Sequence, residues 1–127
     1  MPPTFLTIDQ VIRIHRSMIE TYGGSMGILD QAMLKSAVAM PQATFGGQFL
    51  HGDLYAMAAA YLYHLVQNHS FQDGNKRVGA AAAVVFLAVN DITIQADQDG
   101  LAELTLRVAT GQADKEAIAE FFRERSE

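Results

Sequence analysis

The run from Val78 to Val89 contains only apolar or small residues and not one polar side chain. A helix that is apolar on every face is typical of the interior of a larger structure. The run is too short to cross a bilayer, and Asn90 and Asp91 interrupt it. Its alanines would let neighbouring helices approach closely. This segment therefore predicts an all-α bundle built around one central helix.

Further helices are predicted on both sides of this run, because apolar residues recur there at three- and four-residue spacings. Residues with short polar side chains precede these patterns and can cap a helix. The expected caps are Thr7 (with Gln10 completing a capping box), Asp30, Asp53 and Asp114. A further helix is expected over residues 101–108. Glycine and proline end helices, and the expected ends lie at Gly23, Pro41 and Gly111. Together with the central helix, these signals predict about six helices.

The composition fits one domain that covers residues 1–127. A chain of 127 residues, half of them apolar, is long enough to bury a single core. The net charge of −5 gives no general attraction to nucleic acid or to an anionic membrane. The chain has no cysteine, which excludes disulfides and thiolate metal sites. Because the first residues lack the pattern of a signal peptide, we expect the protein in the cytoplasm.

The stretch 68–77, immediately before the central run, combines a turn with charged and titratable side chains. Gly74 permits a positive φ or a close backbone approach, and Asn75 is expected to be the N-cap of the following helix. The first amides of that helix would then face an anion, assisted by the helix dipole. Lys76 and Arg77 could neutralise phosphoryl charge. This arrangement predicts a phosphate site made by Gly74, Asn75, Lys76 and Arg77.

Two further residues of the stretch suit phosphoryl chemistry. Asp73 supplies a hard oxygen ligand of the kind that binds Mg²⁺ together with substrate phosphates. His69 can accept a proton near neutral pH, as a general base must. Phe71 lies between them and is expected to anchor the loop in the core. We therefore predict that His69 is catalytic and that Asp73 binds the metal.

The same residues carry a family resemblance. The stretch from His69 to Arg77 resembles the Fic/Doc signature His-x-Phe-x-(Asp/Glu)-Gly-Asn-(Gly/Lys)-Arg, with every specified position filled. Residues 8–24, ending in Tyr-Gly-Gly, and residues 101–111, ending in Ala-Thr-Gly, are similar to the Doc (death-on-curing) branch. The resemblance implies a compact Fic/Doc helical bundle. It also implies that residues 41–52 form a short flap, which would hold a target peptide beside the site.

Two departures from the longer Fic proteins bear on the reaction. Those proteins usually carry Gly-Asn-Gly-Arg-x-x-Arg, whereas this chain has Lys76 at the second glycine and Ala80 at the distal arginine. The Doc branch shares both differences and looks like a reworked Fic site that phosphorylates a protein hydroxyl. The resemblance thus implies an ATP- and Mg²⁺-dependent kinase acting on a Ser or Thr of elongation factor Tu, which would arrest translation. A nucleotidyl (AMP) transferase that uses the same residues remains an alternative.

The resemblance also implies a protein partner. The chain has no run of the type (Ser/Thr)-x-x-x-Glu-(Gly/Asn), with which many Fic proteins inhibit themselves. A Doc-like toxin is instead expected to be inhibited by a cognate antitoxin, whose disordered tail folds as a helix in a groove. A catalytically inactive module that only binds the antitoxin is a second alternative. Neither nucleic acid nor a membrane is expected as a direct partner.

Three other histidines receive plainer interpretations. His15 lies on the apolar side of the first predicted helix, and His64 lies close to that of the third. Both are expected to be core or edge residues. His51 belongs to the predicted flap and is expected in a solvated position. These histidines show no recognisable zinc-ligand spacing.

Overall fold

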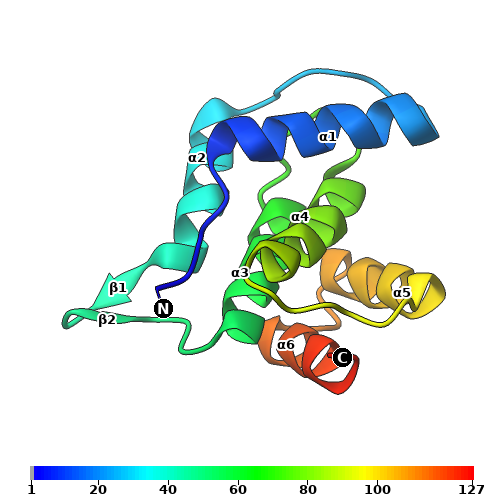
Figure 1. Cartoon of the computed structure of the whole chain (residues 1–127). Coiled ribbons are helices and arrows are strands. Elements are labelled where there is room, and N and C mark those ends of the chain that lie inside the picture. The colour runs from blue at the N-terminus through cyan, green and yellow to red at the C-terminus, as the bar shows by residue number, and fades with distance from the viewer. Residues whose placement is uncertain (1) are drawn as a thin grey trace.

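The computed structural model describes residues 2–127, and helices dominate it (Figure 1). The elements in chain order are α1 (Ile8–Tyr22), α2 (Gln31–Ala39), the 3-10 turn η1 (Met40–Gln42), β1 (Thr44–Phe45), β2 (Gln48–Phe49), α3 (Leu54–Gln67), α4 (Asn75–Val89), α5 (Gln98–Ala109) and α6 (Lys115–Glu124). The two short strands form one antiparallel hairpin. The prediction of an all-α bundle of six helices with a short flap is confirmed.

Helix α4 lies at the centre of the bundle, between α1 on one side and α5 and α6 on the other (Figure 1). It packs most closely on α3, where Gly79 leaves no room for a side chain. A Cβ atom at Gly79 would lie 2.9 Å from Cγ2 of Val66 and 3.1 Å from the carbonyl oxygen of Leu62. The face of α4 that carries Val85 and Val89 remains partly exposed. The central helix therefore has one uncovered apolar side.

The predicted helix caps are confirmed for four helices. Thr7 accepts a hydrogen bond from the amide of Gln10, whose side chain in turn accepts one from the amide of Thr7. The carboxylates of Asp30, Asp53 and Asp114 each accept a hydrogen bond from the amide three residues later. Helix α5 begins earlier than its apolar pattern indicated, because the carboxylate of Asp97 caps it at residue 98.

The flap is a hairpin that projects from the body, at the lower left of Figure 1. The expectation that it lies beside the signature residues is wrong, because Phe49 contacts Phe5, whose ring stacks on Phe86 near the C-terminal end of α4, and the signature lies at the N-terminal end. Thr44 pairs with Phe49, and Phe45 at the tip is 82% exposed. The root of the hairpin is anchored, since Pro41 and His51 are both buried. The prediction that His51 occupies a solvated position is wrong, because its side chain is buried and lies beside Lys115 of α6.

None of the helices described over residues 2–127 is both long and apolar enough to traverse a bilayer.

Candidate active site

The signature loop, residues 68–74, joins α3 to α4 and is fixed against the connection between α1 and α2. Ile28 and Phe71 form an isolated antiparallel bridge. The amide of Gln72 donates a hydrogen bond to the carbonyl of Gly27 (3.1 Å), and the amide of Leu29 donates one to the carbonyl of Ser70 (2.8 Å). The loop therefore behaves as a short strand held by residues 27–29, and its geometry depends on a segment far away in the sequence.

Gly74 turns the chain into α4. Its φ is 77°, in the left-handed region that favours glycine. The side chain of Ile19 lies 3.1 Å from where a Cβ at Gly74 would stand, so the position has little room as well. Gly74 is itself the N-cap, and no side chain caps this helix end. The first amides of α4 therefore remain available to a ligand.

The prediction that Asn75 caps α4 is wrong, because Asn75 is the first helical residue and its side chain is used elsewhere. Its Oδ1 accepts a hydrogen bond from the amide of Phe71 (3.0 Å), and its Nδ2 donates to the carbonyl of Phe71 (2.9 Å). Phe71 itself is 1% exposed, as expected of an anchor. The side chain of Asn75 thus braces the turn.

His69 lies at the start of the loop with an exposed side chain and a backbone φ of 49°. Left-handed φ values are uncommon outside glycine and mark a residue that its surroundings hold in place. The Nδ1 atom of His69 lies 3.4 Å from Nδ2 of Asn75. This contact is long, so it places the ring beside Asn75 without fixing which ring nitrogen carries the proton.

The carboxylate of Asp73 closes the loop and is held in its ionised form. Its Oδ1 accepts a hydrogen bond from the amide of Gly74 (2.8 Å), and its Oδ2 accepts one from the amide of Ser25 (3.2 Å). These two bonds, assisted by the nearby Arg77 guanidinium, hold the pKa of Asp73 below its ordinary value. Residues 2–127 contain no cluster of three or more histidine, aspartate or glutamate side chains that could hold a metal ion.

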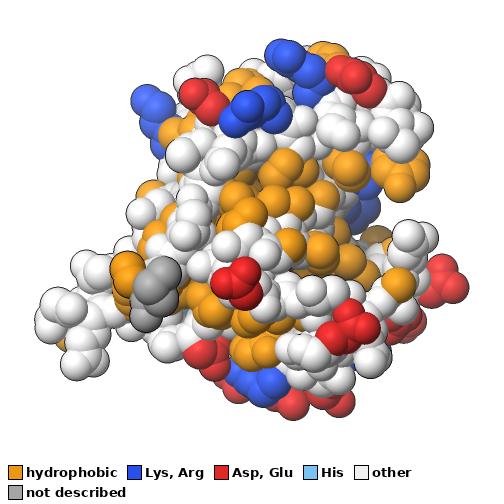
Figure 2. All heavy atoms as spheres, in the orientation of Figure 1, with side chains coloured by type: hydrophobic (Ala, Val, Ile, Leu, Met, Phe, Trp, Pro, Cys, Tyr) orange, Lys and Arg blue, Asp and Glu red, His pale blue; other side chains and the backbone are white. Residues whose placement is uncertain are grey.

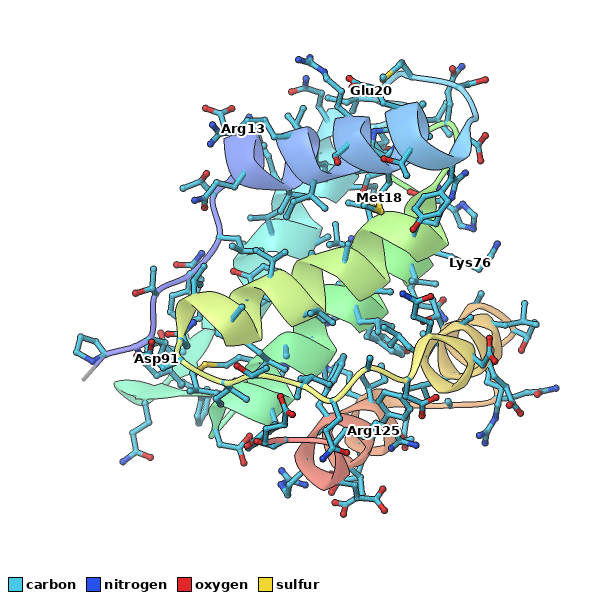
Figure 3. The ribbon with its side chains drawn as sticks, turned by 45° about the vertical axis from the view of Figure 1, so that its right-hand side comes forward. Arg13, Met18, Glu20, Lys76, Asp91 and Arg125 are labelled. Carbon is cyan, nitrogen blue, oxygen red and sulfur yellow. The ribbon has the colours of Figure 1, made fainter. Side chains whose placement is uncertain are left out.

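Lys76 and Arg77 lie on the first turn of α4 but differ in their surroundings. Lys76 is exposed and points away from the body at the N-terminal end of α4 (Figure 3). Arg77 is half-buried, and its Nη1 donates to the carbonyls of Gly23 (2.8 Å) and Met18 (3.4 Å). Arg77 therefore ties the end of α1 to the loop, a role that its place in the signature did not indicate.

The structure thus brings the six predicted site residues together around one turn. The contacts with α1 were missed by sequence reasoning. His15 on that helix is 3% exposed, and its Nε2 lies 2.7 Å from the backbone oxygen of Asp73. Only the apolar spacing of α1 signals a buried position there; nothing in the sequence indicates the bond.

A groove of about 790 Å³ begins at the same end of α4. Its floor is formed by Ala80, Ala81 and Val84 of α4, and its walls come from the end of α1, from residues 94–98 and from α5 and α6. Figure 2 shows this side as a broad apolar area between more polar rims. Lys76 and Arg77 contribute to the lining, so the groove and the predicted phosphate site share two residues.

A second polar cluster lies under the root of the flap. The Nζ atom of Lys115, on α6, lies 3.3 Å from Nε2 of His51 and 3.4 Å from Nε2 of His64. Burial, with the adjacent ammonium group, lowers the pKa of His64 to about 4 and lowers that of His51 as well. Two neutral imidazoles therefore accept hydrogen bonds from one lysine and connect the flap to α3 and α6.

Comparison with known proteins finds three similarities. Residues 5–87 match the model of the Fic/DOC family. The protein named "Toxin Doc" from Mycolicibacterium smegmatis is 41% identical over 100 residues, which cover 77% of each chain. The protein named "Protein kinase doc" from Escherichia phage P1 is 30% identical over 115 residues, which cover 91% of this chain and 90% of the relative.

Proposed function

The chain belongs to the Fic/Doc family and, within it, to the Doc branch, and from this premise we propose that it is the toxin of a toxin–antitoxin module and an ATP-dependent protein kinase. One relative is named a toxin and the other a protein kinase. The observation that carries the proposal is the signature loop, where an accessible imidazole lies beside the free amides of α4 and two cations. Residues 1–127 would form one Fic/Doc domain.

The loop residues divide the work between proton transfer and charge neutralisation. His69 is the general base that takes the proton from a target Ser or Thr hydroxyl. The amides that follow Gly74, with Asn75 placing the turn, hold the phosphates. Lys76 and the unbonded part of the Arg77 guanidinium neutralise the transferred group. Phosphoryl transfer needs this kind of positioning and electrostatic stabilisation more than covalent chemistry.

Asp73 fits the role of an Mg²⁺ ligand. Its carboxylate is ionised and its side chain is 46% exposed, and each of its oxygens already accepts one amide and keeps a further lone pair. One carboxylate is sufficient for Mg²⁺ when phosphates and water supply the remaining ligands. When bound, the ion would neutralise phosphate charge next to the amides of α4.

Lys76 and Ala80 favour transfer of the γ-phosphoryl group over transfer of AMP. A lysine at position 76 brings a cation and a long side chain to the turn where a glycine would leave the amides open to a β-phosphate. Ala80 lines the groove one turn further along α4, where a distal arginine would clamp the outer phosphate. The preferred reaction is therefore phosphorylation, and nucleotidyl transfer is the alternative outcome of the same experiment.

The proposed target is elongation factor Tu, and the proposed outcome is arrest of translation in the cytoplasm. This target rests on the resemblance to the Doc branch, because the hairpin lies near the C-terminal end of α4 and the signature loop lies at its N-terminal end.

The apolar groove supports the proposed antitoxin. An amphipathic helix lays its apolar side into a groove of this kind, and a disordered tail can fold as it binds. Ala81, Val84 and Leu101 are among the lining residues that such a helix would contact. Since Lys76 and Arg77 line the same groove, a bound antitoxin would also reach the phosphate site.

The proposal is tested with purified elongation factor Tu, Mg²⁺ and ATP labelled separately at the α- and γ-phosphates. The expected result is incorporation of the γ label alone, abolished by His69→Ala. Incorporation of the α label would identify a nucleotidyl transferase. If neither label appears on this target or on total cell protein, the chain is not a transferase, and a binding module becomes the better reading.

A further inference from the structure

His15 is the residue of α1 that contacts the signature loop at two points. Its ring stacks on that of Phe71, with centroids 3.8 Å apart and planes 8° from parallel. Its Nε2 lies 2.7 Å from the backbone oxygen of Asp73. A carbonyl oxygen only accepts, so Nε2 carries the hydrogen and donates it. His15 is 3% exposed. A carbonyl or imidazole group that is buried to this degree without a hydrogen-bond partner would lower the stability of the fold.

These two contacts bracket the part of the loop that separates the proposed base from the proposed phosphate cradle. Phe71 follows His69 by two residues, and the carbonyl of Asp73 belongs to the peptide unit that leads into Gly74. Asn75 grips the backbone of Phe71 from the other side. The loop is therefore clamped between α1 and α4, and His15 is the polar part of the α1 side.

The surroundings of His69 make such a clamp necessary. Its φ of 49° is a conformation that a non-glycine residue keeps only when its neighbours hold it there. A displacement of about 1 Å between reacting groups can cost on the order of 10²-fold in rate. The Asp73 carbonyl is the one backbone group of the loop that receives a side-chain hydrogen bond from α1.

We propose that His15 is a positioning residue for phosphoryl transfer, and that it acts by donating its Nε2–H to the Asp73 carbonyl and so fixes His69 relative to the amides of α4. This inference rests on the proposed kinase function. It differs from a purely structural role, in which His15 would fill space under Phe71 and any ring of similar size would serve.

The test compares two substitutions that separate the hydrogen bond from the packing. His15→Phe keeps a flat ring against Phe71 but cannot donate, whereas His15→Gln keeps a donor near the place of Nε2 but cannot stack. Val11→Ala is the matched control, since Val11 lies one turn earlier on the buried side of α1 and its side chain can make no hydrogen bond to the loop. If His15→Phe does not fold, His15→Met replaces it.

We expect the three variants to separate an effect on kcat from an effect on stability. The folded His15→Phe protein should lose roughly 10²-fold in kcat for γ-phosphoryl transfer while its KM for ATP changes little. His15→Gln should recover most of that loss even if it melts at a lower temperature. Val11→Ala should lower the melting temperature and leave kcat per folded molecule unchanged. A wild-type kcat in His15→Phe, or an equal loss in His15→Gln, would overturn the proposal.

A second readout does not depend on activity and so separates this inference from the proposed function. Nitrogen NMR of the imidazole rings should show the Nε2–H tautomer for His15. The amide resonances of residues 69–77 should move in His15→Phe and stay near their wild-type positions in His15→Gln. If His15→Phe leaves these resonances unmoved, His15 does not position the loop, whatever reaction the chain catalyses. If they move as expected and no transfer is found, only the proposed function fails.

Discussion

The imidazole of His69 can be judged by its place in the structure as well as by its place in the signature. It is exposed, held at an unusual φ and adjacent to the free amides of α4. We expect His69→Ala to lose roughly 10²- to 10⁴-fold in transfer rate, the usual contribution of a general base. The measurement is γ-label incorporation at equal folded concentration, with folding checked by circular dichroism. A folded variant that loses less than tenfold would assign the base elsewhere.

The carboxylate of Asp73 has a structural role and a proposed metal-binding role, and one substitution can separate them. Asp73→Asn keeps an oxygen that can accept from Ser25 or Gly74, so the helical content should be retained. The charge that a hard cation requires is lost, and transfer at ordinary Mg²⁺ concentration should be abolished. The measurement is the rate of γ-label transfer by Asp73→Asn and by the wild type as the Mg²⁺ concentration is raised. Undiminished activity of Asp73→Asn at ordinary Mg²⁺ concentration would exclude Asp73 as the essential ligand.

Lys76 is the residue on which the proposed choice of reaction depends. Lys76→Gly removes a cation and a long side chain from the first turn of α4. The expected stability cost is about 1 kcal/mol or less from helix propensity, because the helix dipole already disfavours a cation there. Transfer of the γ-phosphoryl group should be lost. Lys35→Gly, on the exposed side of α2 and outside the groove, is the matched control and should transfer at the wild-type rate. Wild-type transfer by Lys76→Gly would make Lys76 a surface lysine.

The signature loop shows what could be predicted from the sequence at this scale. The types and spacing of residues 69–77 indicated the candidate site residues, because they follow one another in the chain. The sequence could not show that Gly74 rather than Asn75 is the N-cap, since this depends on the hydrogen-bond partners of the Asn75 side chain. The contributions of His15 and Arg77 could not be read either, because their partners lie far away in the sequence.

At the scale of helices, the apolar run and the capping carboxylates predicted the elements well. Each cap is a local interaction within one turn, so the sequence contains all the information that it needs. The uncovered side of α4 was not predicted. A run of Ala and Val looks the same whether a neighbouring helix of this chain or a separate partner covers it. The length of α5 was underestimated because its first turn, from Gln98 to Gly100, has no apolar residue.

The contact between α3 and α4 provides a test in which two effects oppose each other. Gly79→Ala should gain about 1 kcal/mol from helix propensity. The added methyl group would lie 3.1 Å from the backbone oxygen of Leu62 and 2.9 Å from Val66, and overpacking of this kind costs about 1–3 kcal/mol. We expect a net destabilisation, because a backbone oxygen within α3 cannot move aside easily. Urea unfolding gives the free energy of each variant.

A control for this substitution is Gly52→Ala. A Cβ at Gly52 meets nothing within 4 Å and its φ is ordinary, so its free energy of unfolding should change by less than about 0.5 kcal/mol. If Gly79→Ala is as stable as wild type or more stable, the spacing between α3 and α4 is looser than the structure indicates.

At the scale of the whole molecule, the cluster of His51, His64 and Lys115 connects the flap to two helices and makes stability depend on pH. In the folded protein the pKa of His64 is lowered from 6.5 to about 4, and that of His51 is lowered too. The unfolded chain therefore binds protons first as the pH falls. Stability should be highest above about pH 6.5 and should decline toward pH 4. Urea midpoints measured across this range test the expectation.

The histidine effect can be separated from that of the carboxylates. Asp73 and Asp97 have pKa values below their ordinary 3.8, so the stability that they contribute is lost only below that pH. His64→Gln should therefore flatten the decline between pH 6.5 and 4 and leave the steeper loss in stronger acid. If the stability of this variant declines as steeply as that of the wild type between pH 6.5 and 4, His64 is already protonated in the folded state over that range.

The clamp on the signature loop also has a consequence for how the enzyme loses and regains its function. The bonds from His15, Ser25 and Arg77 join residues that are 48 to 58 positions apart in the chain. Closing such loops costs conformational entropy that only the complete fold can offset. Helices, by contrast, form from neighbouring residues and survive in expanded, acid-swollen states. During gradual denaturation, catalysis should therefore disappear together with the helical signal or before it, and never after it.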